Sequence, residues 1–168
     1  LKIGYLRALK ILGKKSLIAT SAFGFPYSIS LGDTFSENPF YNDHVNVGEI
    51  LSVAGWVATK ESPVIYDIGG HCGFIATQLA QILRSSNPVI YSFEPVAPTF
   101  TDLMYSINEL ALGEFIRPVP VALGSRAGFV RLSYSKLNSM LAQVIPENQT
   151  SNRRGGEEIY LAPVLTIE

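Results

Sequence analysis

The second half of the chain alternates between short apolar runs and longer stretches with helical periodicity. The run "VIYDI" at 64–68 is broken only by Asp67, a pattern typical of a strand buried on both faces of a parallel sheet. The turn "GGHCG" follows, and the next stretch, 74–84, carries apolar side chains at helical spacing, namely Ile75, Leu79, Ile82 and Leu83. The pattern predicts a strand, a glycine turn and a helix.

The same unit occurs a second time and leads into a third strand. "VIYSFE" at 89–94 predicts another buried strand, which ends on an acid, and 99–112 carries one apolar helix face. "FIRPVPVAL" at 115–123 predicts the third strand, and its two prolines are tolerated only at a sheet edge. Two right-handed crossovers give the strand order third, second, first, which places this strand at the outer edge.

The remaining pattern is less regular. Alternation predicts a half-exposed strand at 128–134 and another at 159–168, paired antiparallel at the sheet margin, with a polar loop at 135–158 between them. Toward the N-terminus, 27–43 predicts a strand and a loop, and 45–59 a helix. The first residues suit a short amphipathic helix that packs on the body, rests on a membrane or docks a partner, and we favour packing; its apolar residues are Leu6, Leu9, Ile11 and Leu12.

These elements predict an α/β fold, a Rossmann-like three-layer α/β/α sandwich with a mostly parallel sheet. Residues 63–168 would form this domain, and residues 1–62 a helical and loop segment that packs on it. Leu1 is not an initiator Met, and the chain stops at "LAPVLTIE" without a polar tail. We therefore expect an incomplete domain, truncated at its C-terminus.

Composition narrows the class of protein. A chain of 168 residues with 47% hydrophobic content is long enough for one core, and 13 basic against 14 acidic residues leave no basic field for nucleic acid. Cys72 is the single cysteine, so it forms no internal disulfide and matches no metal-binding spacing. Charges interrupt every long apolar run, which predicts no signal peptide and no transmembrane segment. We expect a cytoplasmic protein without a metal site.

Two acids and a glycine turn carry the candidate chemistry. Asp67 and Glu94 fall at the carboxyl ends of neighbouring strands, where ligands bind in such sheets, and a carboxylate placed like Glu94 suits ribose hydroxyls. The dinucleotide fingerprint would need glycine where Ile68 stands, which disfavours NAD. A carboxylate like Asp67 favours a cationic amino-acid end. S-adenosyl-L-methionine combines that end with a ribose.

Three segments in register resemble the FkbM-type methyltransferases, whose usual motifs are D-x-G-A-N-x-G, F-E-P and A-L-G. They are "VIYDIGGHCGFIATQLA", "VIYSFEPVAPTFTDLMYSINELAL" and "VPVALGSRAGFVRL". The resemblance covers about Val64 to Leu132, and "NSM" with the closing "VLTIE" is similar to later family segments. Such proteins normally continue into a fourth strand ending in acids, which we expect to follow beyond Glu168.

The resemblance implies roles for individual residues. Those implied to bind the methionine part and shape the turn are Asp67, Gly69, Gly70 and Gly73. Glu94 would hold the ribose and Pro95 would set the exit of its strand, while Ala122 and Leu123 would lie near the adenine. Where the family has Ala-Asn, this chain has Gly70-His71, so the contact of that Asn is not carried over.

Several alternatives stay open. Asp67 and Glu94 can cap helices instead of binding a ligand. No catalytic base is identified: His71 is a weak candidate, and a backbone and hydrogen-bonding role is the simpler expectation. Cys72 is expected to be a small buried filler. The segment 38–44 either covers an acceptor pocket or forms a surface turn, and "NQT" at 148–150 is expected to be an accidental match to a glycosylation site.

The favoured function is S-adenosylmethionine-dependent methylation of a hydroxyl oxygen on a sugar or another small or secondary metabolite. The expected partner is then a small-molecule or glycan acceptor. One alternative is a nicotinamide-dependent Rossmann oxidoreductase. The other is a truncated, non-catalytic domain that binds a ligand weakly or acts as an interaction module.

Overall fold

The computed structural model describes residues 2–135, 139, 142–146 and 158–167. Its centre is a parallel sheet of three strands in the order β3-β4-β5, formed by Val64–Ile68, Val89–Phe93 and Ile116–Val119. Their register places Ile65 opposite Ile90, and Ile90 opposite Ile116. The predicted parallel order is confirmed, and β5, which contains Pro118, lies at a sheet edge.

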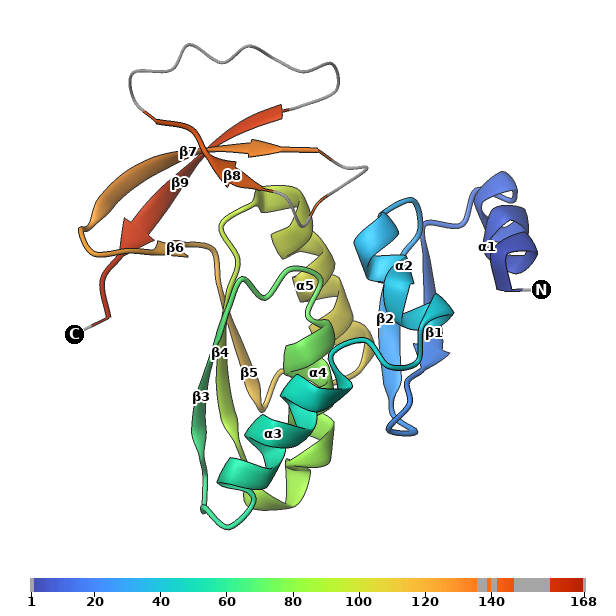
Figure 1. Cartoon of the computed structure of the whole chain (residues 1–168), viewed down its shortest axis with the longest axis horizontal. Helices are drawn as coiled ribbons and strands as arrows, with labels where there is room; N and C mark the ends of the chain where they lie inside the picture. Colours follow the sequence, from blue (N-terminus) through green and yellow to red (C-terminus); the bar gives the residue numbers. More distant parts are fainter. Residues whose placement is uncertain (1, 136–138, 140–141, 147–157, 168) are drawn as a thin grey trace.

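The helices of this unit pack on one face of the sheet (Figure 1). They are α3 (Val47–Val57), α4 (Phe74–Ile82) and α5 (Ala97–Glu109), and a short 3-10 turn, η1, follows α4 at Arg84–Ser86. Their apolar residues form one core with Ile90 and Ile116 of the sheet, both at most 1% exposed. The strands and crossover helices therefore follow the predicted Rossmann-like arrangement.

The prediction that 64–68 is buried on both faces is wrong. β3 is an edge strand, and Val64, Tyr66 and Ile68 are each more than half exposed. These three side chains alternate with Ile65 and Asp67, so they point to the face opposite the helices. Within the described residues the helices α3, α4 and α5 share one face only, and the second helical layer of the predicted sandwich is not formed there.

The late strands form a sheet of their own, not the margin of the parallel sheet. Its order is β6-β9-β7-β8, formed by Ala122–Leu123, Glu158–Leu165, Gly128–Tyr134 and Gln143–Val144. β7 and β9 pair antiparallel as predicted, whereas β6 is parallel to β9 and β8 lies inside the predicted loop. The predicted third strand is divided after Val119, and Pro120 and Val121 separate its two parts.

The N-terminal part contains a hairpin that the sequence pattern did not reveal. β1 (Ser16–Thr20) pairs antiparallel with β2 (Pro26–Ser30), and α2 (Thr34–Tyr41) occupies much of the predicted loop. The hairpin is tied to α4 because Gln78 Nε2 donates to Pro26 O at 3.1 Å and Gln78 Oε1 accepts from Ser21 Oγ at 2.6 Å. Both contacts connect the N-terminal segment to the helical layer.

The first helix, α1 (Lys2–Ile11), packs on α2. Leu6 is 1% exposed, and Lys10 Nζ lies 2.6 Å from Oε1 of the buried Glu37. Ile11 and Leu12, which were expected to share the apolar face, are 83% and 73% exposed. No helix in the described part of the chain is long and apolar enough to cross a bilayer.

Candidate functional site

The glycine turn after β3 is fixed to the end of β4. Gly69, His71 and Gly73 adopt left-handed backbone conformations, with φ of 83°, 51° and 86°. Such values favour glycine, and among other residues Asn, Asp and His adopt them most readily. The N–H groups of Gly69 and Gly70 both donate to Phe93 O at 2.9 Å. His71 is thus one of the residue types that this left-handed position tolerates.

Gly70 is required for space. Its φ is not positive, but a β-carbon at this position would lie 1.9 Å from Ser92 Oγ and 3.0 Å from Asp67 Oδ2. Ser92 is fully buried and donates from Oγ to Asp67 Oδ2 at 2.7 Å. The absence of a side chain at Gly70 therefore lets Ser92 hold the Asp67 carboxylate beside the turn.

Asp67 lies in a partly buried position that disfavours its charge. Burial raises the pKa of its carboxyl above the ordinary value, and the nearby Glu94 carboxylate raises it further, while the hydrogen bond from Ser92 opposes both effects. A cationic group close to Asp67 would offset the loss of hydration. The site therefore favours a ligand that brings a positive charge to this carboxylate.

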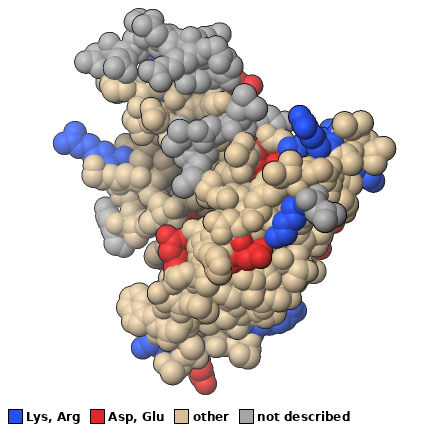
Figure 2. Space-filling view, turned by 45° about the vertical axis from the view of Figure 1, so that its right-hand side comes forward, with Lys and Arg blue, Asp and Glu red and all other residues tan. Residues whose placement is uncertain are grey.

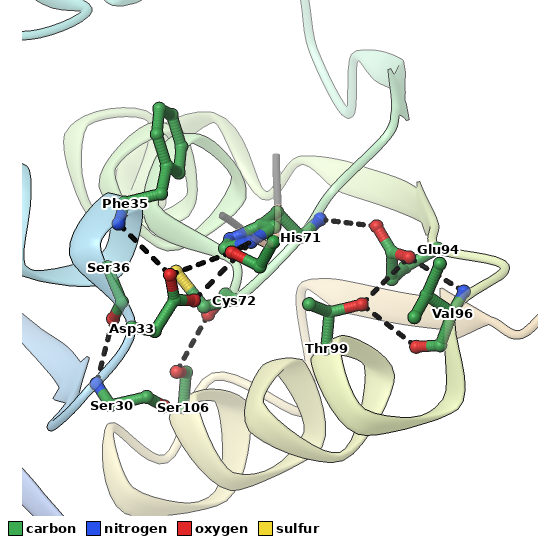
Figure 3. A network of polar contacts seen from close by, with 11 residues as sticks. Ser30, Asp33, Phe35, Ser36, His71, Cys72, Glu94, Val96, Thr99 and Ser106 are labelled. Carbon is green, nitrogen blue, oxygen red and sulfur yellow. Dashed lines mark hydrogen bonds and ion pairs between the residues drawn. The ribbon is translucent and has the colours of Figure 1, made fainter. Parts of the chain in front are cut away.

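Glu94 follows β4 directly and is 6% exposed. Its Oε1 accepts from Val96 N at 2.7 Å and Thr99 Oγ1 at 2.9 Å, and its Oε2 accepts from His71 N at 3.0 Å (Figure 3). Glu94 thus stabilises the start of α5, as the capping alternative expects, and also the glycine turn. A carboxylate has about four acceptor positions, so one remains at Oε2 for a ligand hydroxyl.

These groups line a pocket of about 430 Å³, within the range that holds small-molecule ligands. Of the residues expected at the site, those that line it are Asp67, Gly69, Gly70, His71, Glu94 and Pro95. Gly73 instead is the N-cap residue of α4, where a β-carbon would lie 2.7 Å from Leu103 Cδ1. Ala122 and Leu123 are not among the lining residues, and their backbone pairs with β9.

Part of the pocket wall was not predicted from the sequence. It includes Phe35 of α2, Asn46 and Glu49 at the start of α3, and Leu132 of β7. The segment 38–44 does not line the pocket, and its residues Tyr41 to His44 are exposed. Asp33 as a capping residue and Glu37 in the first turn are sequence signals for the start of α2. No sequence pattern, however, places that helix against the glycine turn.

His71 lies between Asp33 and Glu94 (Figure 3). Its side chain is 12% exposed, and its Nε2 lies 2.6 Å from Ser139 Oγ and 3.5 Å from Asp33 Oδ2. Ser139 Oγ also donates to Asp33 Oδ1 at 2.7 Å. The ring packs edge to face against Phe35 at 5.1 Å. Two segments far apart in sequence, 33–35 and Ser139, therefore hold this imidazole.

Cys72 has the properties expected of a buried filler. It is 4% exposed, and burial raises the pKa of its thiol to about 12. The thiolate is the nucleophilic form, so Cys72 stays protonated and unreactive at neutral pH. Of "NSM", only Ser139 is described, and "NQT" lies outside the described residues.

The charges on the surface are mixed. Figure 2 shows acidic and basic side chains interspersed over one face, separated by wide uncharged areas.

No family model matches the chain, and no curated protein matches it.

Among solved structures, the chain is similar to a Thermotoga maritima S-adenosylmethionine-dependent O-methyltransferase, at 12% identity over 95% of this chain and 82% of that one, with a TM-score of 0.40. A protein-L-isoaspartate O-methyltransferase matches at 13% identity over 66% and 30%, with a TM-score of 0.37. A protein described as an rRNA methylase from Clostridium thermocellum matches at 12% identity over 42% and 40%, with a TM-score of 0.36. The chain spans less than half the length of the last two. These similarities are too low to assign an activity.

Proposed function

We propose that the chain is an S-adenosylmethionine-dependent methyltransferase that acts on a hydroxyl oxygen of a sugar or another small metabolite. One observation carries the proposal: Asp67 and Glu94 line one pocket, with the glycine turn held between them. The resemblance to FkbM-type enzymes rests on these same residues. The support is therefore the geometry of the site and the order of its residues along the chain.

The residues of the pocket fit this cofactor in three respects. A cation would stabilise the charge of the partly buried Asp67 carboxylate, and the ammonium group of the methionine part is such a cation. Glu94 Oε2 retains one acceptor position for a ribose hydroxyl. Phe74, Ile75 and Leu132 provide apolar wall for an aromatic base.

The same geometry disfavours a dinucleotide. A pyrophosphate needs backbone N–H groups that point at the ligand. Here the N–H groups of Gly69 and Gly70 donate to Phe93 O, and that of His71 donates to Glu94. These three N–H groups bind the end of β4 and Glu94, so they are not available to a phosphate.

When bound, the cofactor supplies an electrophilic methyl group on a sulfonium. The protein has to hold the acceptor oxygen in line with that group, exclude water and remove the hydroxyl proton. Asp67 and Glu94 would fix the two ends of the cofactor. The acceptor would enter beside Phe35, Asn46 and Glu49, which line the pocket on the N-terminal side.

The activity is tested with S-adenosylmethionine labelled in its methyl group. The full chain is incubated with a panel of sugars, glycosides and hydroxylated small molecules, and label transfer is measured. We expect transfer to a hydroxylated acceptor and its loss in Asp67→Ala. Reduction of NAD by the same panel, without label transfer, would contradict the proposal and favour an oxidoreductase.

A further inference from the structure

A connected set of polar side chains extends from the pocket into the N-terminal segment. We propose that Asp33 and Ser139 hold the proton of His71 on Nε2, so that Nδ1 is the base that accepts the proton of the acceptor hydroxyl. This inference rests on the proposed methyl transfer and names the base for it.

The hydrogen bonds determine the tautomer. Ser139 Oγ lies 2.7 Å from Asp33 Oδ1 and 2.6 Å from His71 Nε2, but a hydroxyl has only one proton to donate. An ionised carboxylate cannot donate, so Ser139 donates its hydroxyl proton to Asp33 Oδ1. Nε2 must then donate its own proton to Ser139 Oγ. The neutral imidazole consequently has a free lone pair on Nδ1.

Among the described residues, none is a hydrogen-bond partner of Nδ1. This atom is buried, although His71 lines the ligand pocket. A buried acceptor without a donor costs about 1–3 kcal/mol. Nδ1 is closed to solvent in this structure, so the imidazole or its cover has to shift as the acceptor binds, and the acceptor hydroxyl then supplies the missing donor.

The imidazole is held in place from both sides. Asp33 is 4% exposed, and its Oδ1 also accepts from Phe35 N at 3.0 Å as the cap of α2. On the other side, the backbone N–H of His71 donates to Glu94. The residue that would remove the proton is therefore fixed to the acid proposed to hold the ribose. Asp33 and Ser139 act as positioning residues.

The proton balance of the step is simple. As the acceptor oxygen bonds to the methyl group, the bond between that carbon and sulfur breaks and its electron pair stays on sulfur. The hydroxyl proton moves to His71 Nδ1, which makes an imidazolium ion. The Asp33 carboxylate, 3.5 Å from Nε2, stabilises that positive charge until the proton leaves to solvent.

The tautomer is measured without cofactor or acceptor. The chain contains two histidines, His71 and His44, so a protein labelled with 15N in its histidine rings gives two sets of signals, and the exposed His44 is assigned with His44→Gln. In mildly alkaline buffer we expect His71 to show a protonated Nε2 and an unprotonated Nδ1. In Asp33→Ala the Ser139 hydroxyl loses its acceptor and is free to donate to Nε2, and we expect a population with the proton on Nδ1. A wild-type signal with the proton on Nδ1 would overturn the proposal.

Two further variants separate this inference from the proposed function. We expect His71→Asn, which suits the left-handed backbone, to bind S-adenosylhomocysteine like wild type and to lower label transfer about a hundredfold or more. Unchanged transfer in this variant would refute the role of His71 and leave the methyltransferase proposal intact. Failure of wild type to bind S-adenosylhomocysteine would instead refute the proposed function.

Ser139→Ala should shift the tautomer toward a mixture, whereas a wild-type spectrum would show that Ser139 has no positioning role.

Discussion

Ser92 occupies the space that a side chain at Gly70 would need. A β-carbon at position 70 would lie 1.9 Å from Ser92 Oγ, and the same Oγ donates to Asp67. The two residues lie on adjacent parts of the fold, the turn after β3 and the C-terminal end of β4. The glycine and the serine are thus coupled through the position of the Asp67 carboxylate.

This coupling predicts the effect of Gly70→Ala. The added methyl group pushes Ser92 Oγ away from Asp67, and we expect the free energy of unfolding to fall by about 1–3 kcal/mol, as in other overpacked sites. Cofactor binding should weaken as well. Chemical denaturation and calorimetry measure the two effects.

A double-mutant cycle with Ser92→Ala provides the control. Removing Oγ leaves the Ser92 β-carbon 3.3 Å from the new methyl group, so the clash is largely relieved. Gly70→Ala should therefore cost less stability in the Ser92→Ala background than in wild type. Additive effects of the two substitutions would show that the contact is not the cause.

Glu94→Gln tests the acid after β4. The amide keeps the shape of the side chain, but its NH2 group cannot accept hydrogen bonds. The substitution therefore breaks either the hydrogen bond from His71 or those from Val96 and Thr99. We expect binding of S-adenosylhomocysteine to weaken at least ~10-fold, since hydrogen bonds to charged groups are the stronger ones. Glu114→Gln, at an exposed ion pair with Arg84, is the matched control and should bind like wild type.

Asp67→Asn should separate stability from binding. Burial raises the pKa of Asp67, so in wild type its contribution to stability is present below the ordinary carboxyl pKa and is lost as pH rises through the higher folded value. The neutral amide avoids this loss. We expect the variant to melt at a higher temperature than wild type at neutral pH, and the difference to shrink on acidification. Binding of S-adenosylhomocysteine should weaken about 10-fold or more. A variant that is both less stable and equally tight in binding would contradict this account.

The contact between α1 and α2 predicts an unequal effect of two lysines. Lys10→Met leaves the buried Glu37 without its cation, and we expect a loss of about 1–3 kcal/mol in the free energy of unfolding. Lys2→Met removes an exposed pair with Asp43 and should cost less than about 1 kcal/mol. Denaturation of both variants under the same conditions compares them directly.

The local pattern predicted the elements of the parallel sheet well. β3 has the predicted bounds, and the prolines placed β5 at an edge, because each of these features depends on neighbours in sequence. Long-range features were missed. "VIYDI" contains the same residues whether a second helical layer covers Tyr66 or not, and periodicity cannot tell the two cases apart.

The candidate site shows the same division. Asp67, Gly69, Gly70 and Glu94 were predicted from their places at strand ends, and they line one pocket. The surroundings of His71 could not be predicted, because Asp33 and Ser139 are separated by 106 residues and meet only in the folded chain. Ala122 and Leu123 were placed by resemblance alone, and the structure does not bring them to the pocket wall.

Binding of S-adenosylhomocysteine to the full chain, measured by isothermal titration calorimetry alongside NAD, tests the central claim most directly. The account predicts saturable one-to-one binding of S-adenosylhomocysteine, weakened in Asp67→Asn and Glu94→Gln, and no tight binding of NAD. Tight binding of NAD without any response to S-adenosylhomocysteine would contradict it.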